Sequence, residues 1–394
     1  MNRSIVFINS LFPCLSETFV HDQFRALQEA GMPFAIVSNN RPPDTQVHPR
    51  MKNIQTAVFY LADASSGTLL AAHWGAFRRH PLRYLSALAR LPFSAEPLKT
   101  ALAQLTGAAL VLNRYRDLPH LHLHAHFTYG AAAVALWAKR LAGTPYSLTL
   151  HGSDLTYDNP PDLEARLRNA EGLVSISRFN VDFLHRHHPK VQPRLLEVIR
   201  MGIEPLPVAP ERPPRGPCLH ILNVGRLSDH KAQHSLIDAC ALLARHGYDF
   251  RCDIVGEGER RAFLEQRIAE HGIGDRVRLL GPKFHDAVLK LYETADLFVL
   301  CSIAEGQPIV LMEAMRAGVP VIASAITAIP ELIQDGGLLV PPDNPAALAE
   351  AIAATCEQRV DWAPMTRRAR QIVATEYDLQ TNHRKFKTWL EALP

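Results

Sequence analysis

Short apolar runs alternate with longer amphipathic stretches along the first half of the chain. The apolar runs have the length of β-strands and occupy residues 4–10, 33–40, 145–152 and 172–177. Residues 16–30 and 130–143 repeat apolar positions with a helical period, so they predict helices, and Gly31 is placed to end the first. Strands that alternate with helices form a parallel sheet covered on both faces. The first half therefore predicts an α/β domain.

A proline-rich stretch separates this half from a second series of strands and helices. Residues 205–217 read PLPVAPERPPRGP, a proline density that neither a helix nor a central strand accepts. Further strands are expected at residues 219–226, 250–256, 277–281, 296–302, 319–324 and 337–342, with helices beginning near Lys231 and at Pro308. We predict two doubly wound domains, at 1–207 and 218–375, with a linker at 208–217 and a final helix at 376–394. Open α/β sheets bind ligands at the carboxyl ends of their strands, so we expect the active site in an interdomain cleft.

A basic insertion is expected at about residues 67–117 of the first domain. Up to Arg116 it carries seven Arg or Lys residues against one acidic residue, Glu96. Apolar and basic positions alternate at helical spacing in this stretch, namely Phe77, Tyr84, Leu88 and Leu91 with Arg78, Arg79, Arg83 and Arg90. Such a surface can contact the anionic inner face of a cell membrane, and a solvated helical hairpin packed on the domain would show the same pattern. Both interpretations stay open.

Composition narrows the possible partners and the compartment. With 394 residues, 47% of them hydrophobic, the chain is long enough for two domains with separate cores. A formal net charge of +3 without a block of like charges argues against a nucleic-acid partner. The six cysteines lie far apart, as buried thiols do in a reducing compartment, and no signal-peptide pattern or membrane-spanning stretch is present. We therefore expect a cytoplasmic protein.

The stretch HLHLHAHF carries four histidines at alternate positions, His120, His122, His124 and His126. Alternate residues of a strand share one face, and an H-x-H pair on a strand can hold zinc in metal-dependent hydrolases. The other interpretation is a strand whose histidines face a polar crevice. The pattern by itself does not choose between them.

The segment NVGRLSDHK follows a predicted strand of the second domain. Gly225 allows a tight turn, and Arg226 and Lys231 supply two cations that suit a departing nucleoside diphosphate. A solvated pair of cations would have the same sequence, so this segment alone is weak evidence.

The segment AEGQPIVLMEAMRAGVPV is more specific. Glu305 lies in a loop after a strand, and Glu313 lies inside an apolar helix, where an unpaired carboxylate would be costly. Glu305 could hold sugar hydroxyls and Glu313 a ribose diol. The donor-binding positions predicted beside these acids are the loop residues Gly306 and Gln307, the first-turn residue Pro308, and the phosphate-facing amides of Ile309, Val310 and Leu311.

At these residues the chain resembles the retaining glycosyltransferases of family 4. NVGRLSDHKAQHSLIDACALL is similar to the family's G-R-L…K-G…L-I-A-L segment, DIVGEGERRAFLE to its V-G-x-G-x-x-R turn, and EGQPIVLMEAMRAGVPV to its E-x7-E segment. SLTLHGSD, VSISRFNVDFL and VIRMGIEP match in the first half. FPCLSETFVHDQFRALQEAG resembles the subset that acts in bacterial exopolysaccharide assembly, including colanic-acid-type enzymes. The resemblance implies the GT-B fold, two facing Rossmann-like domains with an interdomain cleft and a C-terminal helix that crosses back onto the first domain.

The resemblance also implies roles for individual residues. Arg226 and Lys231 become the diphosphate clamp, Glu305 the carboxylate near the donor sugar and His151 a catalytic residue beside its anomeric centre, while Glu313 binds the ribose. Base recognition is expected near Lys283 and Phe284. The acceptor side is assigned Ser16, Glu17, Thr18, His124, His126 and Asp154, of which Asp154 supports the loop of His151. Because the family is metal-independent, no cofactor or metal is expected, and the zinc interpretation of the histidines loses weight.

Three positions depart from the family pattern. Ala232 stands where the family usually has glycine, LSET replaces a glycine pair in the first strand-to-helix loop, and IQDGGLLV is shorter than usual. The GEGERR turn lacks the last glycine of a dinucleotide fingerprint, which disfavours a dehydrogenase.

We therefore expect a retaining glycosyltransferase that moves a sugar from a UDP- or GDP-sugar to a hydroxyl of a glycan or polyprenyl-linked acceptor in cell-surface polysaccharide biosynthesis. A nucleotide-sugar 2-epimerase or hydrolase on the same fold is the main alternative. A zinc-dependent hydrolase built on the His120–His126 run is the second.

Overall fold

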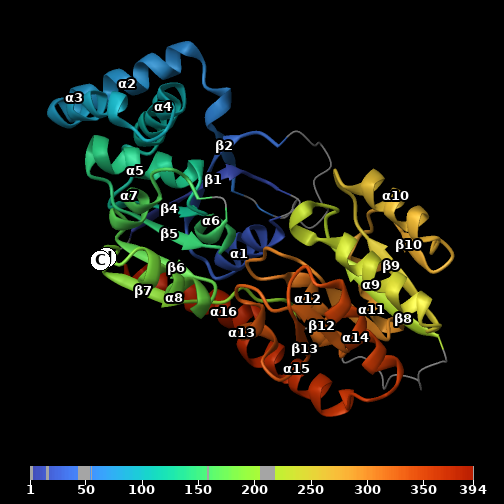
Figure 1. Ribbon diagram of the computed structural model, residues 1–394. Helices are drawn as coiled ribbons and strands as arrows, with labels where there is room; N and C mark the ends of the chain where they lie inside the picture. The colour runs from blue at the N-terminus through green and yellow to red at the C-terminus, as the bar shows by residue number, and fades with distance from the viewer. Residues whose placement is uncertain are drawn as a thin grey trace. The chain divides into compact units, whose positions relative to one another are not determined.

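The computed structural model describes residues 3–14, 17–42, 54, 56–157, 159–204 and 218–393. The chain divides into two compact units (Figure 1), Met1–Ile199 with Gln380–Pro394 and Arg200–Leu379. The division falls before the expected domain end at 207, because a bridge between Ile203 and Asp378 ties the residues after Ile199 to the second unit. The predicted linker at 208–217 lies outside the described residues.

The first unit is built on a parallel sheet of seven strands in the order β3-β2-β1-β4-β5-β6-β7. The strands are β1 (Ser4–Leu11), β2 (Phe34–Asn40), β3 (Val58–Tyr60), β4 (Leu121–His126), β5 (Tyr146–Leu150), β6 (Gly172–Ser175) and β7 (Leu195–Val198). The helices are α1 (Thr18–Glu29), α2 (Ser66–Arg79), α3 (Pro81–Arg90), α4 (Leu98–Arg114), α5 (Gly130–Ala142), α6 (Ser153–Thr156), α7 (Leu163–Arg168), α8 (Arg178–His187) and α16 (Leu379–Ala392). The strand order is that of a doubly wound, Rossmann-like sheet.

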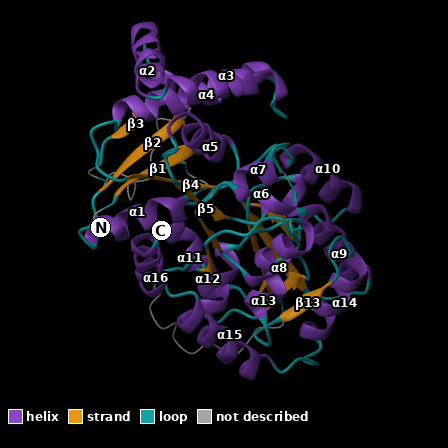
Figure 2. Ribbon diagram, turned by 90° about the vertical axis from the view of Figure 1, so that its left-hand side faces the viewer, coloured by secondary structure: helices purple, strands orange, loops and turns teal. Residues whose placement is uncertain are grey.

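Both faces of this sheet are buried, so successive residues of β1 belong to different apolar clusters. Val6 and Ile8 pack in the cluster that contains α4 and α5, whereas Ile5 and Phe7 pack in the cluster that contains α1 and α16. Figure 2 shows these helices on opposite sides of the sheet. This explains why the strands read as continuous apolar runs.

The last helix, α16, packs on the sheet of the first unit. The Phe386 ring lies 6.5 Å from that of Phe7, and Trp389 and Leu390 are buried in the same cluster. Gly172 permits this close approach, because a Cβ atom there would lie 2.6 Å from Cδ2 of Leu393. The C-terminal residues thus complete a core that begins at the N-terminus.

The second unit has a parallel sheet of six strands in the order β10-β9-β8-β11-β12-β13. The strands are β8 (Leu219–Val224), β9 (Phe250–Val255), β10 (Val277–Leu279), β11 (Leu297–Leu300), β12 (Val321–Ser324) and β13 (Leu338–Val340). The helices are α9 (Gln233–Arg245), α10 (Arg261–His271), α11 (His285–Thr294), α12 (Ile309–Ala317), α13 (Ile329–Ile333), α14 (Pro345–Cys356) and α15 (Trp362–Glu376). Two apolar clusters again cover its two faces. Each unit is therefore a Rossmann-like layer structure, as the alternation predicts.

Three helices begin later than expected. The first begins at Thr18, and Ser16 lies outside the described residues. α9 begins at Gln233, after a 3₁₀ turn that contains Lys231, and α12 begins at Ile309 with Pro308 as its N-cap residue. Among the described residues, every helix falls short of the length or the hydropathy that a membrane span requires.

The basic insertion forms α2, α3 and α4. α4 packs on both α2 and α5, and α3 packs on α5. Figure 1 shows the three helices together at one end of the first unit. Leu91 is buried, and Phe77, Tyr84 and Leu88 are partly buried, so these four side chains fit the interpretation in which the helices pack on the domain. Their periodicity reports packing on the unit.

Candidate functional site

The loop after β8 is fixed by backbone contacts with the loop after β9. Gly225 donates its N–H to Val255 O at 2.9 Å, and Leu227 bonds Glu257 O at 3.0 Å. Gly256 lies at φ 150°, and a Cβ atom there would stand 1.9 Å from Gly225 O. Only glycine allows this approach. The GEGERR turn therefore holds the loop that carries the predicted diphosphate ligands.

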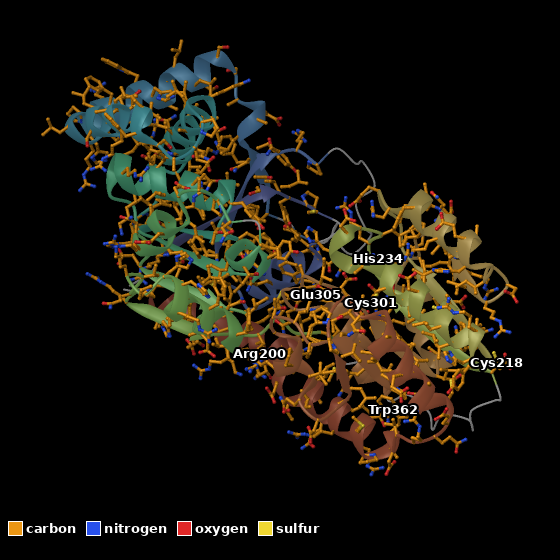
Figure 3. All side chains as sticks on the ribbon, in the orientation of Figure 1. Arg200, Cys218, His234, Cys301, Glu305 and Trp362 are labelled. Atoms are coloured by element: carbon orange, nitrogen blue, oxygen red, sulfur yellow. The ribbon has the colours of Figure 1, made fainter. Side chains whose placement is uncertain are left out.

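Lys231 and Glu305 form the central ion pair of this site. Lys231 Nζ lies 2.5 Å from Glu305 Oε1, and the Ser302 hydroxyl donates to the same oxygen at 2.7 Å. The side chain of Glu305 is only 8% exposed, whereas that of Lys231 is 24% exposed. The backbone is tied as well, because Ile303 N–H bonds His230 O at 2.8 Å. Figure 3 labels Glu305 and Cys301 in the second unit.

Ala232, which stands where the family usually has glycine, has a strained backbone conformation. It lies in the left-handed region at φ 47° and is fully buried. An alanine in this region costs about 1 kcal/mol. The backbone after Lys231 thus takes the conformation that glycine adopts freely, although the residue is alanine.

Arg226 does not join Lys231. Its side chain is 71% exposed and pairs with Glu259, at 3.0 Å from Nη2 to Oε2. The predicted two-cation clamp is therefore not assembled in the structure, which brings together Lys231 and Glu305 instead. Because Glu259 is itself exposed, the Arg226 pair is a weak one.

The start of α12 presents fewer free amides than the sequence predicts. The N–H of Leu311 donates to Pro308 O at 3.1 Å, so the amide of Leu311 is already bonded. Ile309 and Val310 precede this first bonded amide and keep the free N–H groups of a helix N-terminus. The prediction for Leu311 is therefore wrong, and the anion-binding position is limited to the loop and the first two helical residues.

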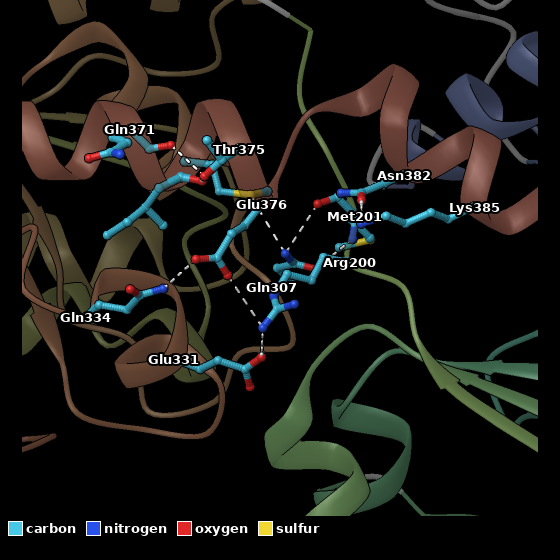
Figure 4. Close-up of polar contacts among 12 residues, drawn as sticks. Arg200, Met201, Gln307, Glu331, Gln334, Gln371, Thr375, Glu376, Asn382 and Lys385 are labelled. Atoms are coloured by element: carbon cyan, nitrogen blue, oxygen red, sulfur yellow. Dashed lines mark hydrogen bonds and ion pairs between the residues drawn. The ribbon is translucent and has the colours of Figure 1, made fainter.

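The side chain of Gln307 has a structural contact rather than an open one. Its Oε1 accepts from Met201 N–H at 2.9 Å, and its Nε2 donates to Met201 O at 3.3 Å. Figure 4 shows Gln307 facing Met201, beside the ion pair of Arg200 with Glu331 at 2.6 Å. Gln307 thus anchors the glutamate loop, and only its backbone is available to a donor.

Glu313 is buried in a polar cluster that the sequence analysis missed. Its Oε1 lies 2.7 Å from Nε2 of His285, and the hydroxyl of Tyr292 donates to its Oε2 at 3.2 Å. The adjacent Lys283 and Phe284 are exposed, with Phe284 at the N-cap of α11. Two side chains of α11, His285 and Tyr292, offset the cost of burying this carboxylate with hydrogen bonds. The only feature of the sequence that could have indicated this cluster was the histidine at the beginning of that helix.

The histidines of β4 lie inside the first unit. His122 and His124 are fully buried, and both bond the hydroxyl of Ser147 at 2.8 Å. Nε2 of His124 lies 2.9 Å from the hydroxyl of Thr149. Burial lowers the pKa of His124 well below its usual value, so both rings are neutral.

The predicted acceptor role of His124 is therefore wrong, as is the polar crevice along the strand. β4 is a central strand, and its histidine face is covered by α16: the ring of His124 lies 5.3 Å from that of Phe386 and 5.9 Å from that of Trp389. Both ring nitrogens of His124 are bonded to hydroxyls, so this histidine offers no free nitrogen to a zinc ion. No cluster of three or more potential metal ligands occurs in the described part of the chain.

His126 and His151 form a pair at the carboxyl ends of β4 and β5. Nδ1 of His126 lies 3.3 Å from Nε2 of His151, and the ring of His151 packs 4.1 Å from that of Phe127 and 4.9 Å from that of Phe19. Burial lowers the pKa of both histidines, that of His126 to about 3. Nδ1 of His151 is buried and has no hydrogen-bond partner among the described residues.

Asp154 holds the loop that follows β5, as expected. Its carboxylate accepts the N–H groups of His151 and Thr128, both at 2.9 Å. Burial raises the pKa of Asp154 to about 6, and the backbone bonds oppose that rise. Gly152, at φ 100°, allows the tight turn between His151 and Asp154.

Glu17 and Thr18 begin α1, but neither side chain caps the helix. Burial raises the pKa of Glu17 to about 7. A carboxyl group that titrates near neutrality can exchange protons with a bound hydroxyl, which keeps Glu17 a candidate acceptor-side residue.

Solved structures identify the fold. The structure superposes on Anabaena HepE in complex with UDP with a TM-score of 0.73 at 19% identity, covering 99% of this chain and 100% of that one. The lipopolysaccharide outer core galactosyltransferase WaaB gives a TM-score of 0.72 at 17% identity, covering 99% of both chains. Two Rossmann-like units of this kind define the GT-B fold.

The sequence comparisons identify the family. Residues 16–202 match the glycosyl transferase 4-like domain and residues 215–372 match the glycosyl transferases group 1. The amylovoran biosynthesis glycosyltransferase AmsK of Erwinia amylovora is 32% identical over 289 residues, 68% of this chain and 69% of AmsK. WcaL of Escherichia coli, a glycosyltransferase assigned to colanic acid biosynthesis, is 28% identical over 97% of this chain and 98% of its own. The chain therefore belongs to the group 1, family 4-like glycosyltransferases and is a transferase enzyme.

Proposed function

We propose that this enzyme transfers a sugar from a nucleotide-sugar donor to a hydroxyl of a glycan or polyprenyl-linked acceptor, with retention at the anomeric carbon, in exopolysaccharide biosynthesis. The relatives AmsK and WcaL support the pathway. HepE, which has the same fold, was solved with UDP-glucose, and this supports a nucleotide-sugar donor. The observation that carries the proposal is the Lys231–Glu305 pair beside the free amides of α12.

The donor diphosphate is proposed to bind Lys231 and the N–H groups of Ile309 and Val310. A compact ammonium and a helix N-terminus both favour a phosphate anion, and together they stabilise the charge that develops on the leaving group. Lys231 is now held by Glu305, so it moves from a carboxylate to a phosphate oxygen when the donor binds. This frees Glu305 to accept hydrogen bonds from hydroxyls of the donor sugar.

Retention is proposed to follow a same-face substitution. The bond between the anomeric carbon and the diphosphate oxygen breaks, the acceptor oxygen bonds the same carbon on the same face, and the acceptor's proton passes to a departing phosphate oxygen. His151, neutral and with an unpartnered Nδ1 in the described structure, is proposed to hydrogen-bond the donor sugar. Glu313 is proposed to bind the ribose, with His285 as its positioning residue.

We also propose that transfer needs no metal ion, because Lys231 and the α12 amides supply the positive charge that a metal would provide. Chelation with EDTA is expected to leave the rate unchanged, and loss of activity that Mg²⁺ or Mn²⁺ restores would contradict this. No disulfide joins the cysteines that the structure describes, which supports the proposal of a reducing, cytoplasmic compartment.

The experiment compares Lys231→Gln and Glu305→Gln with Lys290→Gln, a change of an exposed lysine in the same unit. UDP- and GDP-sugars are first screened by thermal shift, because a ligand that binds the folded state raises the apparent stability. Lys231→Gln should lower kcat by roughly 100-fold, the scale of losing one group that stabilises transition-state charge, while Lys290→Gln stays at the wild-type rate.

The anomeric configuration of the product, read by NMR, tests retention, and donor incubated without acceptor tests the rival activity. An inverted product would overturn the retaining mechanism. An epimerised sugar formed without acceptor would favour the 2-epimerase, and wild-type turnover by Lys231→Gln would refute the role of this lysine.

A further inference from the structure

The surface of α3 is apolar where a soluble helix is usually polar. Leu82 is 82% exposed and Leu85 is 53% exposed, and Phe93, just after the helix, is 87% exposed. Ala87, on the opposite side of α3, is buried in the core of the first unit. Exposed side chains of this size on adjacent turns mark a surface that contacts something apolar.

A basic pocket of about 560 Å³ opens beside the same leucine. It lies between α3 and the C-terminal end of α5, and its lining residues are Leu82, Arg83, Ser86, Ala87, Arg90, Lys139, Arg140, Gly143 and Asn169. Four of these nine residues are cationic, and none is acidic. The pocket therefore suits an anion.

Three of the four cations keep their charge available to a ligand. Lys139 is neutralised by Glu171, at 2.8 Å, but Arg83, Arg90 and Arg140 form no ion pair with any residue that the structure describes. The pKa of Arg140 is lowered chiefly by burial; the charge of Asp162 opposes this shift, and the charge of Arg90 adds to it. Burying a cation is costly unless an anion pairs with it, so three cations without an ion pair favour an anionic ligand.

Gly143 brings Arg83 into this cluster. A Cβ atom at Gly143 would lie 2.5 Å from Nη1 of Arg83, so the guanidinium passes directly over the glycine at the end of α5. Guanidinium groups bind phosphate oxygens with two parallel hydrogen bonds. The close packing places that group in the lining of the pocket, together with Leu82.

We propose that α3 is a docking surface for an anionic phospholipid bilayer, in which Arg83, Arg90 and Arg140 bind a lipid phosphate while Leu82, Leu85 and Phe93 enter the boundary between head groups and acyl chains. A soluble phosphate would explain the pocket but not the exposed leucines at its rim. Only a lipid presents a phosphate and an apolar phase within one side-chain length of each other. This site is distinct from the donor site of the second unit and does not depend on the proposed function.

The test is flotation of the full-length enzyme with vesicles of phosphatidylcholine alone or with about one third phosphatidylglycerol. Wild type should float with the anionic vesicles and detach at high salt, because screening removes the attraction. The variant Arg83→Gln/Arg90→Gln should partition roughly 30-fold more weakly, about fivefold for each cation lost at an anionic surface. Arg245→Gln/Lys290→Gln removes the same charge from exposed positions of the second unit and should float like wild type.

Further variants test the apolar contribution. Leu82→Gln/Phe93→Gln should also weaken flotation, whereas Leu118→Gln, a partly exposed leucine of the same unit, should not. Inorganic phosphate added in millimolar amounts distinguishes the source: it should compete weakly, because it lacks the acyl contact. All variants should keep the wild-type thermal shift with nucleotide, which separates this proposal from that on the donor site.

Four outcomes would overturn the proposal. They are absence of wild-type flotation, equal capture by neutral vesicles, an equal loss in the control pair Arg245→Gln/Lys290→Gln, and complete release by millimolar phosphate. A dimer in solution that Leu82→Gln/Phe93→Gln converts to a monomer would assign the surface to a second copy of the chain instead.

Discussion

Gly256 offers a sharp test of how the donor loop is built. Gly256→Ala would place a Cβ atom 1.9 Å from Gly225 O at φ 150°, a backbone region that only glycine adopts readily. The backbone strain costs of order 1–3 kcal/mol, and moving the backbone of Gly225 adds to it, so we expect a total of about 3–5 kcal/mol. The displaced loop carries Arg226 and leads to Lys231, so the thermal shift with nucleotide should also fall.

Two other glycines of the second unit serve as controls. Gly247→Ala places its Cβ in open space at φ 77°, so its free energy of unfolding should fall only by the cost of a left-handed alanine, about 1 kcal/mol. Gly274→Ala meets only Ile268, at 3.8 Å, and should be neutral or stabilising by about 0.5 kcal/mol. The order of stability is therefore Gly274→Ala, then Gly247→Ala, then Gly256→Ala.

The assay is urea unfolding followed by fluorine NMR of enzyme labelled with 5-fluorotryptophan. Trp362 is the single tryptophan of the second unit and packs against its core, so its signal reports that unit alone. It is labelled in Figure 3. If the midpoint for Gly256→Ala falls no further than that for Gly247→Ala, the backbone contact with Gly225 does not hold the loop.

Three further predictions concern the first unit. Burial lowers the pKa of His126 from 6.5 to about 3, so the unfolded chain binds more protons than the folded one below pH 6.5. The free energy of unfolding should therefore fall by about 1.4 kcal/mol for each pH unit between pH 6.5 and about 3. His126→Gln should show a shallower decline in acid unfolding. The raised pKa of Glu17 has the opposite sign, because its stabilising neutral form is lost as the pH rises from 4.5 through about 7, and Glu17→Gln should flatten this part of the stability profile; an unchanged profile would contradict the burial of this carboxyl group. Trp389→Ala should lower the free energy of unfolding of the first unit, read from the fluorine signal of Trp137, by about 3–5 kcal/mol. The unfolding midpoint read from Trp362 should not change. A destabilisation seen only at Trp362 would show that α16 does not stabilise the first unit.

The donor segment shows how far residue spacing predicts a site. The strand, the loop and the helix around Glu305 and Glu313 were all predictable, because each follows from local periodicity and from a proline and a glycine at the helix ends. The partner of each carboxylate was not, since Lys231 and His285 come from other segments of the chain. Pairing across a sheet edge depends on strand order, which periodicity does not contain.

The histidine strand shows the opposite case, a clear pattern with the wrong environment. Alternation correctly predicts a strand that carries His122, His124 and His126, but it also predicted His120, which lies before the strand at φ 48°. It cannot tell that α16, more than 250 residues later, covers the face of His124 with Phe386 and Trp389. The basic insertion is similar, because its helices were expected, whereas its exposed apolar residues, which include Leu82, Leu85 and Phe93, are not the ones that the periodicity singled out.

By itself the sequence determined the two Rossmann-like units, the family and the loops that carry the chemistry, because these depend on local periodicity and on residues that punctuate it. Only the tertiary structure decided which charged side chains form ion pairs, which histidines are buried and which apolar side chains are exposed. The physical reason is that burial and ion pairing are properties of neighbours in space. Those neighbours are set by strand order and by the return of the C-terminal helix, which no single stretch of the chain encodes.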